Sequence, residues 1–108
     1  MLRLLLLPLI AGVVLAEEQD SARPNYKPSG GYVPDEQTAV AIAVAVWTPI
    51  YGKENIDKQK PYTAELKDGV WHVRGTLQQP LIGRKTGGVA EAEISKDDGR
   101  VLRIIHDK

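Results

Sequence analysis

Hydrophobic and polar positions follow two different periods along this chain. The first apolar block, AVAIAVAVW over residues 39–47, carries no charge and follows Pro34, Asp35 and Glu36, which favour the first turn of a helix. Alanine is the strongest helix former and is depleted in strands. The block therefore predicts a helix from about Asp35 to Thr48, which Pro49 ends or kinks. A glycine stop at Gly52 precedes a short second helix over residues 53–59.

From Pro61 onward the apolar residues recur at every second position, which is the period of a strand. Strands are expected over residues 62–67, 70–77, 89–95 and 100–106. Asp68-Gly69 supplies a hairpin turn, residues 96–99 supply another turn, and residues 78–88 form a loop. The predicted fold is α+β, with the N-terminal helix and the short second helix packed on a four-stranded antiparallel sheet in meander order.

The apolar residues of the first helix fall into two stripes at 100° per residue. One sheet can bury only one stripe, so the other is expected to meet the second helix, a second copy of the chain or a partner. The first stripe contains Val40, Val44 and Trp47, and the second contains Ile42 and Val46 with Ala39 and Ile50.

The N-terminus has the pattern of a secretory signal peptide. Arg3 precedes 13 apolar residues, Leu4 to Ala16, and small or short side chains lead up to Glu17. This run is shorter than the roughly 20 residues that span a bilayer. We expect cleavage after Ala16, export to the periplasm or beyond, and no stable membrane insertion afterwards. Residues 17–31 are rich in charge, proline and glycine and predict a disordered linker, which leaves residues 32–108 as the folded domain.

Composition narrows the classes of partner and cofactor. The chain has 14 basic and 14 acidic residues, so removal of Arg3 with the leader leaves 13 basic residues and a net charge near −1. The sequence contains no broad basic region, so we do not expect it to bind nucleic acid. The chain has no cysteine, so disulfides do not stabilise it.

The candidate chemical groups are few. His72 and His106 are too far apart in the sequence to predict a metal site, and no cofactor motif is present; either histidine could still pair with Glu91, Glu93 or Asp107 as an acid and base. Glu91 and Glu93 project from the same face of one strand, which would suit glycoside hydrolysis but is also typical of a solvated sheet. We expect this face to be a mixed-charge recognition surface without catalytic residues.

Several segments together resemble a known family. They are YVPD over 32–35, PIYG over 49–52, KPY over 60–62, DGVW over 68–71, GGV over 87–89 and DGRVL over 98–102. In this order they are similar to the nuclear transport factor 2 fold immunity proteins, including the bacterial group also called YbbC/YhhH-like. The resemblance implies a shortened cystatin-like, helix-on-sheet domain that is not an enzyme and that binds and neutralises a cognate toxin of interbacterial competition.

The leader and the resemblance together predict a periplasmic immunity protein that occludes its toxin, with a homodimer through the helix as a further possibility. The exposed cations of the loop over residues 83–88 would contribute to binding. The expected partner-binding residues are His72, Arg74, Arg84, Lys85, Glu91, Glu93 and Arg103.

Two other functions remain open from the sequence. The DGRVL ending is also similar to secreted peptidase-propeptide and YpeB modules, which are inhibitory or sensory. Larger members of the fold superfamily bind small substrates between sheet and helices, so an enzyme is a third reading.

Overall fold

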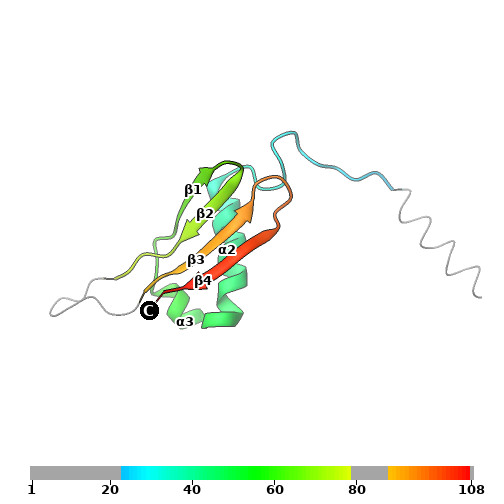
Figure 1. Cartoon of the computed structure of the whole chain (residues 1–108). Helices are drawn as coiled ribbons and strands as arrows, with labels where there is room; N and C mark the ends of the chain where they lie inside the picture. Colours follow the sequence, from blue (N-terminus) through cyan, green and yellow to red (C-terminus); the bar gives the residue numbers. More distant parts are fainter. Residues whose placement is uncertain (1–22, 79–87, 108) are drawn as a thin grey trace, which may run out of the picture.

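The computed structural model describes residues 23–78 and 88–107, which contain two helices followed by four strands (Figure 1). The predicted α+β class is confirmed. The strands pair in the order β1-β2-β3-β4 and all pairs are antiparallel, so the predicted meander is also confirmed. The elements are α2 (Glu36–Tyr51), α3 (Lys53–Asp57), β1 (Thr63–Lys67), β2 (Val70–Arg74), β3 (Ala90–Ser95) and β4 (Val101–His106).

Both ends of α2 are fixed by local chemistry. Asp35 is the N-cap, and its Oδ1 accepts hydrogen bonds from the Thr38 backbone N–H at 2.8 Å and from the Thr38 hydroxyl at 2.7 Å. These bonds favour the carboxylate and lower the pKa of Asp35 below its usual 3.8. The predicted end at Thr48 is wrong, because the helix continues through Pro49, where one backbone donor is lost. It ends at Tyr51, with Gly52 at φ 91° as its C-cap.

The first hairpin matches its sequence signal closely. Asp68 and Gly69 have φ of 50° and 76°, as a two-residue turn between twisted strands requires. The predicted strand to Leu77 is shorter in the structure and ends at Arg74. The Gly75 N–H still donates to the Ala90 carbonyl oxygen at 3.0 Å, and the chain then leaves the sheet as the Thr76 N–H donates to the Gln59 carbonyl oxygen at 2.7 Å.

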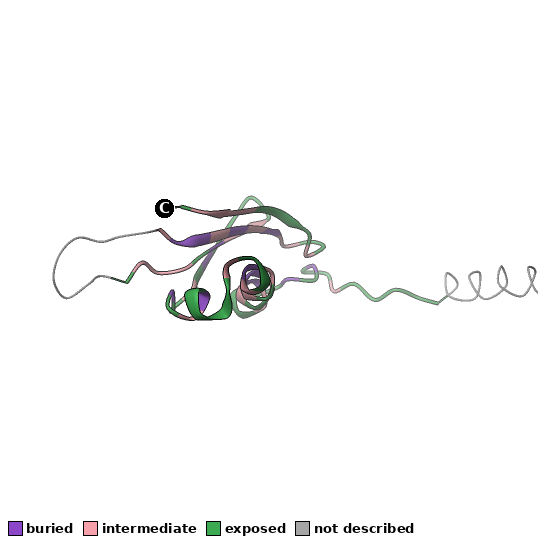
Figure 2. Ribbon diagram, turned by 90° about the horizontal axis from the view of Figure 1, so that it is seen from below, coloured by how far each residue is buried: buried purple, intermediate pink, exposed green. Residues whose placement is uncertain are grey.

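The sheet is covered on one side only (Figure 2). Helix α2 packs mainly across β1, β2 and β3. On β3, Ala90, Ala92 and Ile94 are buried toward the helix, while the residues between them lie on the other side. Residues 23–78 and 88–107 therefore form two layers, and none of them covers the other face of the sheet.

The line of contact on α2 consists of Ala39, Ala43 and Trp47, all of which are fully buried. Alanine side chains let the helix backbone approach the sheet closely. The two predicted stripes are the margins of one broad apolar face, and the expectation that the sheet buries only one of them is wrong. The half-buried margins are Val40 and Val44 on one side and Ile42 and Val46 on the other, whereas Ile50 is exposed.

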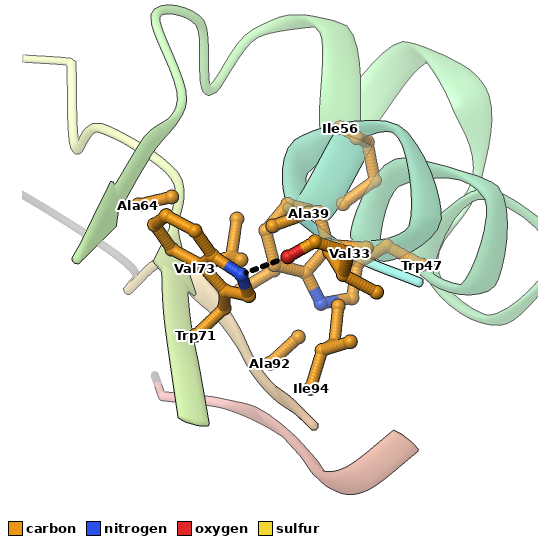
Figure 3. Close-up of a cluster of buried hydrophobic side chains, with 11 residues drawn as sticks. Val33, Ala39, Trp47, Ile56, Ala64, Trp71, Val73, Ala92 and Ile94 are labelled. Carbon is orange, nitrogen blue, oxygen red and sulfur yellow. Dashed lines mark hydrogen bonds between the residues drawn. The ribbon is translucent and has the colours of Figure 1, made fainter. Parts of the chain in front are cut away.

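The residues that precede α2 are held against the far end of the sheet. The Trp71 indole N–H donates to the Val33 carbonyl oxygen at 2.8 Å (Figure 3), and the Val33 N–H donates to the Lys96 carbonyl oxygen at 3.0 Å. Gly31 has φ 90°, and a Cβ there would lie 2.9 Å from the Asp97 Cα. The Lys27 ammonium also pairs with the Asp97 carboxylate at 2.6 Å. The sequence predicted a disordered linker over residues 17–31. Within the described part of that segment, Lys27 and Gly31 contact the turn after β3, whereas residues 17–22 lie outside the described residues.

We predict that Ala43→Leu destabilises the domain by about 1–3 kcal/mol, because the larger side chain forces α2 away from the sheet. Ala41→Leu is the matched control, since Ala41 is exposed on the same helix and leucine and alanine have similar helix propensities. Chemical denaturation of both variants measures the difference. Equal midpoints would show that the helix does not pack closely at Ala43.

We also predict a pH-dependent contribution from the Asp35 cap. Because the folded-state pKa is lowered, the stabilisation is present above the unfolded pKa and is lost as the pH falls through the folded value. Asp35→Ala should lower the thermal midpoint at pH 7, and the gap to wild type should narrow in acid. Asp35→Asn keeps an acceptor without a titrating group, so its gap at pH 7 should be smaller than that of Asp35→Ala, and it should also narrow in acid as the wild type loses the charged cap. A constant gap for Asp35→Ala would contradict the assignment.

Candidate binding surface on the open face of the sheet

Five of the seven predicted partner-binding residues lie together on the open face of the sheet. The pairing register sets His72 opposite Glu93, Arg74 opposite Glu91, and Glu93 opposite Arg103. His72, Arg74, Glu91 and Glu93 each follow a buried residue on β2 or β3, and Arg103 is paired with Glu93, so all five point away from α2. We call these five residues the open-face cluster.

The ion pairs of the open-face cluster are loose. The Arg74 Nε lies 3.7 Å from Glu91 Oε1, and the Arg103 Nη1 lies 3.8 Å from Glu93 Oε2. Both arginine side chains are about three-fifths exposed, at 58% and 61%. Exposed pairs of this kind contribute roughly 0–1 kcal/mol. The cluster therefore adds little to folding, and its charges remain accessible to another molecule.

A shallow hollow lies at the centre of the cluster. It is lined by His72, both glutamates, Arg103 and Ile105, and its volume is about 40 Å³. Pockets for small substrates have volumes of roughly 300–1,000 Å³. Among the described residues, no hydrogen bond joins His72 to either glutamate, so the geometry does not assemble an acid and base. The hollow is suited to one protruding side chain of a partner or to a few waters.

The sequence missed three neighbours of this cluster. The register continues from His72 to Glu65 on β1, so that Glu65, His72, Glu93 and Arg103 form one row across all four strands. Lys67 and Ile105 lie on the same face. The alternation of β1 placed Glu65 and Lys67 opposite the buried Ala64, but the strand pairing was needed to bring them beside the cluster.

His106 lies on the opposite face from His72. Its ring packs 4.9 Å from the Tyr51 ring, and its Nε2 lies 3.1 Å from the Gln59 amide nitrogen. Gln59 is buried, and its Oε1 accepts a hydrogen bond from the Ala90 N–H at 2.8 Å. Because the Gln59 amide nitrogen donates to His106, the histidine Nε2 accepts and its Nδ1–H donates to the Asp107 carbonyl oxygen at 2.7 Å. His106 therefore has a structural role.

The remaining predictions concern the loop over residues 83–88, metal sites and membrane insertion. Arg84 and Lys85 lie outside the described residues, so their place in the surface stays a prediction. Within residues 23–78 and 88–107, no three His, Cys, Asp or Glu side chains converge as a metal site would require. No helix in that same part of the chain is long and apolar enough to cross a membrane.

Two helices on one side of a four-stranded antiparallel sheet, whose other face carries accessible charges, define an α+β domain of the helix-on-sheet class. A family model described as NTF2 fold immunity protein matches residues 38–108. The chain is also 32% identical over 89 residues to the uncharacterized protein YhhH of Escherichia coli (strain K12), a match that covers 78% of this chain and 68% of YhhH. No solved structure matches the chain significantly. The chain therefore belongs to the NTF2-fold immunity proteins, and the family resemblance of the sequence is confirmed.

We predict that removing the cluster charges leaves folding unchanged. Glu91→Gln and Glu93→Gln together should shift the free energy of unfolding by no more than about 0.5 kcal/mol, because both side chains lie on the open face. Ile94→Ala, in the same strand but facing α2 and fully buried, should cost about 2–5 kcal/mol. Urea denaturation measures all three. A large loss in the glutamate variant would show that the cluster is structural.

Proposed function

We propose that this immunity protein binds a toxin of interbacterial competition through the open-face cluster and neutralises it by occlusion, outside the cytoplasm. Membership of the family supports an immunity role. The single observation that carries the proposal is the open face itself, on which charged side chains gather without a structural task.

The arginines are the strongest candidates for anchoring a partner. Arginine is enriched among the residues that dominate protein interfaces, and a guanidinium can bind a carboxylate through two parallel hydrogen bonds. Arg74 and Arg103 flank Glu91 and Glu93 on β3, so the surface presents both signs of charge within three neighbouring strands. A partner with complementary charges would be oriented by this pattern and would associate faster at low salt.

The interior of the domain supports binding rather than catalysis. The space between α2 and the sheet, where larger members of the superfamily hold substrates, is filled here by Trp47, Val73 and Ile94, each fully buried. Among the described residues, every buried side-chain nitrogen and oxygen has a hydrogen-bond partner. A site for chemistry between the layers would displace this packing.

The N-terminal sequence supports action outside the cytoplasm. Arg3 and the apolar run to Ala16 have the pattern of a secretory leader, and an exported protein meets its toxin after translocation. The toxin would then act on a target such as peptidoglycan or the membrane rather than on cytoplasmic nucleic acid.

The proposal is tested by co-expressing the protein with the toxin encoded beside its gene and measuring survival and complex formation. Arg74→Glu with Arg103→Glu should abolish protection and weaken binding at least about thirtyfold, corresponding to a loss of roughly 2 kcal/mol or more. Lys58→Glu is the control, because Lys58 is exposed on the far side of the domain, just after α3. Wild-type binding by the double arginine variant, with its fold intact by circular dichroism, would refute the open-face assignment.

Location is tested separately with a chain that lacks residues 1–16 and stays in the cytoplasm. This form should fail to protect, although it should bind the purified toxin as tightly as the exported form. Full protection by the confined form would refute the extracytoplasmic part of the proposal. A peptidase or sensor gene at the same locus, with no toxin, would instead favour the propeptide-like module.

A further inference from the structure

The two edges of the sheet are protected to different degrees. At one edge, β1 is short and carries the exposed charges of Glu65 and Lys67, which is a common way to block further strand pairing. At the other edge, β4 reads VLRIIH over residues 101–106, with Arg103 as its one formal charge. The β4 edge therefore has little to prevent another strand from pairing with it.

The position of α2 leaves the first half of the same strand uncovered. Helix α2 packs mainly on β1, β2 and β3, and β4 lies beyond it at the rim of the sheet (Figure 2). None of its residues reaches full burial. Val101 and Leu102 remain 38% and 43% exposed, although both are large and apolar.

The backbone of β4 offers hydrogen-bonding groups to a further strand. The Asp107 N–H donates to the Val89 carbonyl oxygen at 3.3 Å, and Ile105 is opposite Glu91. Because antiparallel residues face the partner strand alternately, the backbone groups of Ile105 and Asp107 point toward β3. Those of Ile104 and His106 therefore point outward, at an edge that no described strand occupies.

We propose that β4 pairs with β4 of a second copy of this chain, antiparallel and with the two-fold axis at Ile105. This register brings the outward groups of Ile104 opposite those of His106 of the second copy, so both sets are satisfied. It also places Arg103 opposite Asp107 of the second copy, and the symmetry repeats this opposite-charge pair.

The neighbouring symmetric registers are less favourable. An axis at Arg103 would place two arginines directly opposite each other, which destabilises a sheet. An axis at Ile104 would leave Arg103 opposite an isoleucine and would bring the β-bulge between Glu93 and Ile94, which displaces Leu102, into the pairing. The register at Ile105 avoids both problems, and for this reason the strand fits a copy of itself.

The pairing would join two four-stranded sheets into one continuous sheet of eight strands. Both open-face clusters would then lie on the same side of that sheet. The dimer would present two toxin-binding surfaces side by side, but the pairing itself does not depend on the proposed function.

Amide hydrogen exchange tests the pairing residue by residue, on the protein purified in the form that the cell produces. At high protein concentration the amides of Ile104 and His106 should be protected, and dilution should expose them. The amides of Ile105 and Asp107 face β3 and should stay protected at both concentrations, which makes them internal controls. Sedimentation velocity over the same concentrations should show a dimer that dissociates.

Charge exchange tests the register. Asp107→Lys should raise the dimer dissociation constant by about tenfold or more, because each lysine then faces Arg103 of the other copy. Adding Arg103→Asp should restore the wild-type constant, since the pair is reversed rather than removed. Glu65→Lys, which makes the same carboxylate-to-lysine change on the opposite edge strand, should have no effect on the dimer dissociation constant.

Three results would overturn the inference. One is a chain that stays monomeric up to about 1 mM. Another is a dimer that Ala45→Arg on the exposed side of α2 disrupts while Asp107→Lys does not, which would place the contact on the helix. The third is protection of Ile104 and His106 only in the complex with the toxin, which would assign this edge to the toxin instead of a second copy.

Discussion

A single helix is narrower than the sheet that it must cover, and this geometric constraint determines most of the structure. A helix with its side chains is about 10–12 Å across, while the outer two of four strands lie about 14 Å apart at a spacing of roughly 4.8 Å. Helix α2 therefore cannot shield all four strands. It sits over β1 to β3, and its alanine line brings it close enough for Trp47 and Ile94 to close the core between the layers. Among the described residues, one face of the sheet and the β4 edge remain open.

The core is small, so directional bonds supplement its apolar contacts. Each tryptophan buries its ring and uses its indole N–H to hold a distant carbonyl: Trp71 bonds to Val33, and Trp47 bonds to Glu91 at 3.2 Å. Such bonds fix where the chain enters α2 and how α2 lies on β3. A core with few large side chains can thus have one defined arrangement, although its buried apolar surface is limited.

Local patterns in the sequence were sufficient to predict the elements and part of the surface. The helix followed from the alanine-rich run, the hairpin from Asp68-Gly69, and the shared face of Glu91 and Glu93 from strand alternation. What the sequence could not supply were contacts between distant residues. The sequence predicted two separate apolar stripes on α2, whereas the structure has one broad face centred on Ala39, Ala43 and Trp47. Side-chain size drew attention to valine and isoleucine, while the closeness of the two layers favours alanine. The packing of His106 on Tyr51, and the anchoring of Val33 by Trp71, depend on tertiary neighbours that no local period reveals.

The two hydrogen bonds that Gln59 accepts affect which sequence changes the connection between β2 and β3 can tolerate. Its carbonyl oxygen receives the Thr76 N–H as the chain leaves β2, and its side-chain oxygen receives the Ala90 N–H where β3 begins. One residue thus fixes both the exit and the return of the connection between these strands. The free energy of closing a loop rises only slowly with its length. Insertions, deletions and substitutions between the two fixed points can therefore accumulate without changing the register of the sheet. This tolerance would let the same fold adapt to toxins whose sequences change.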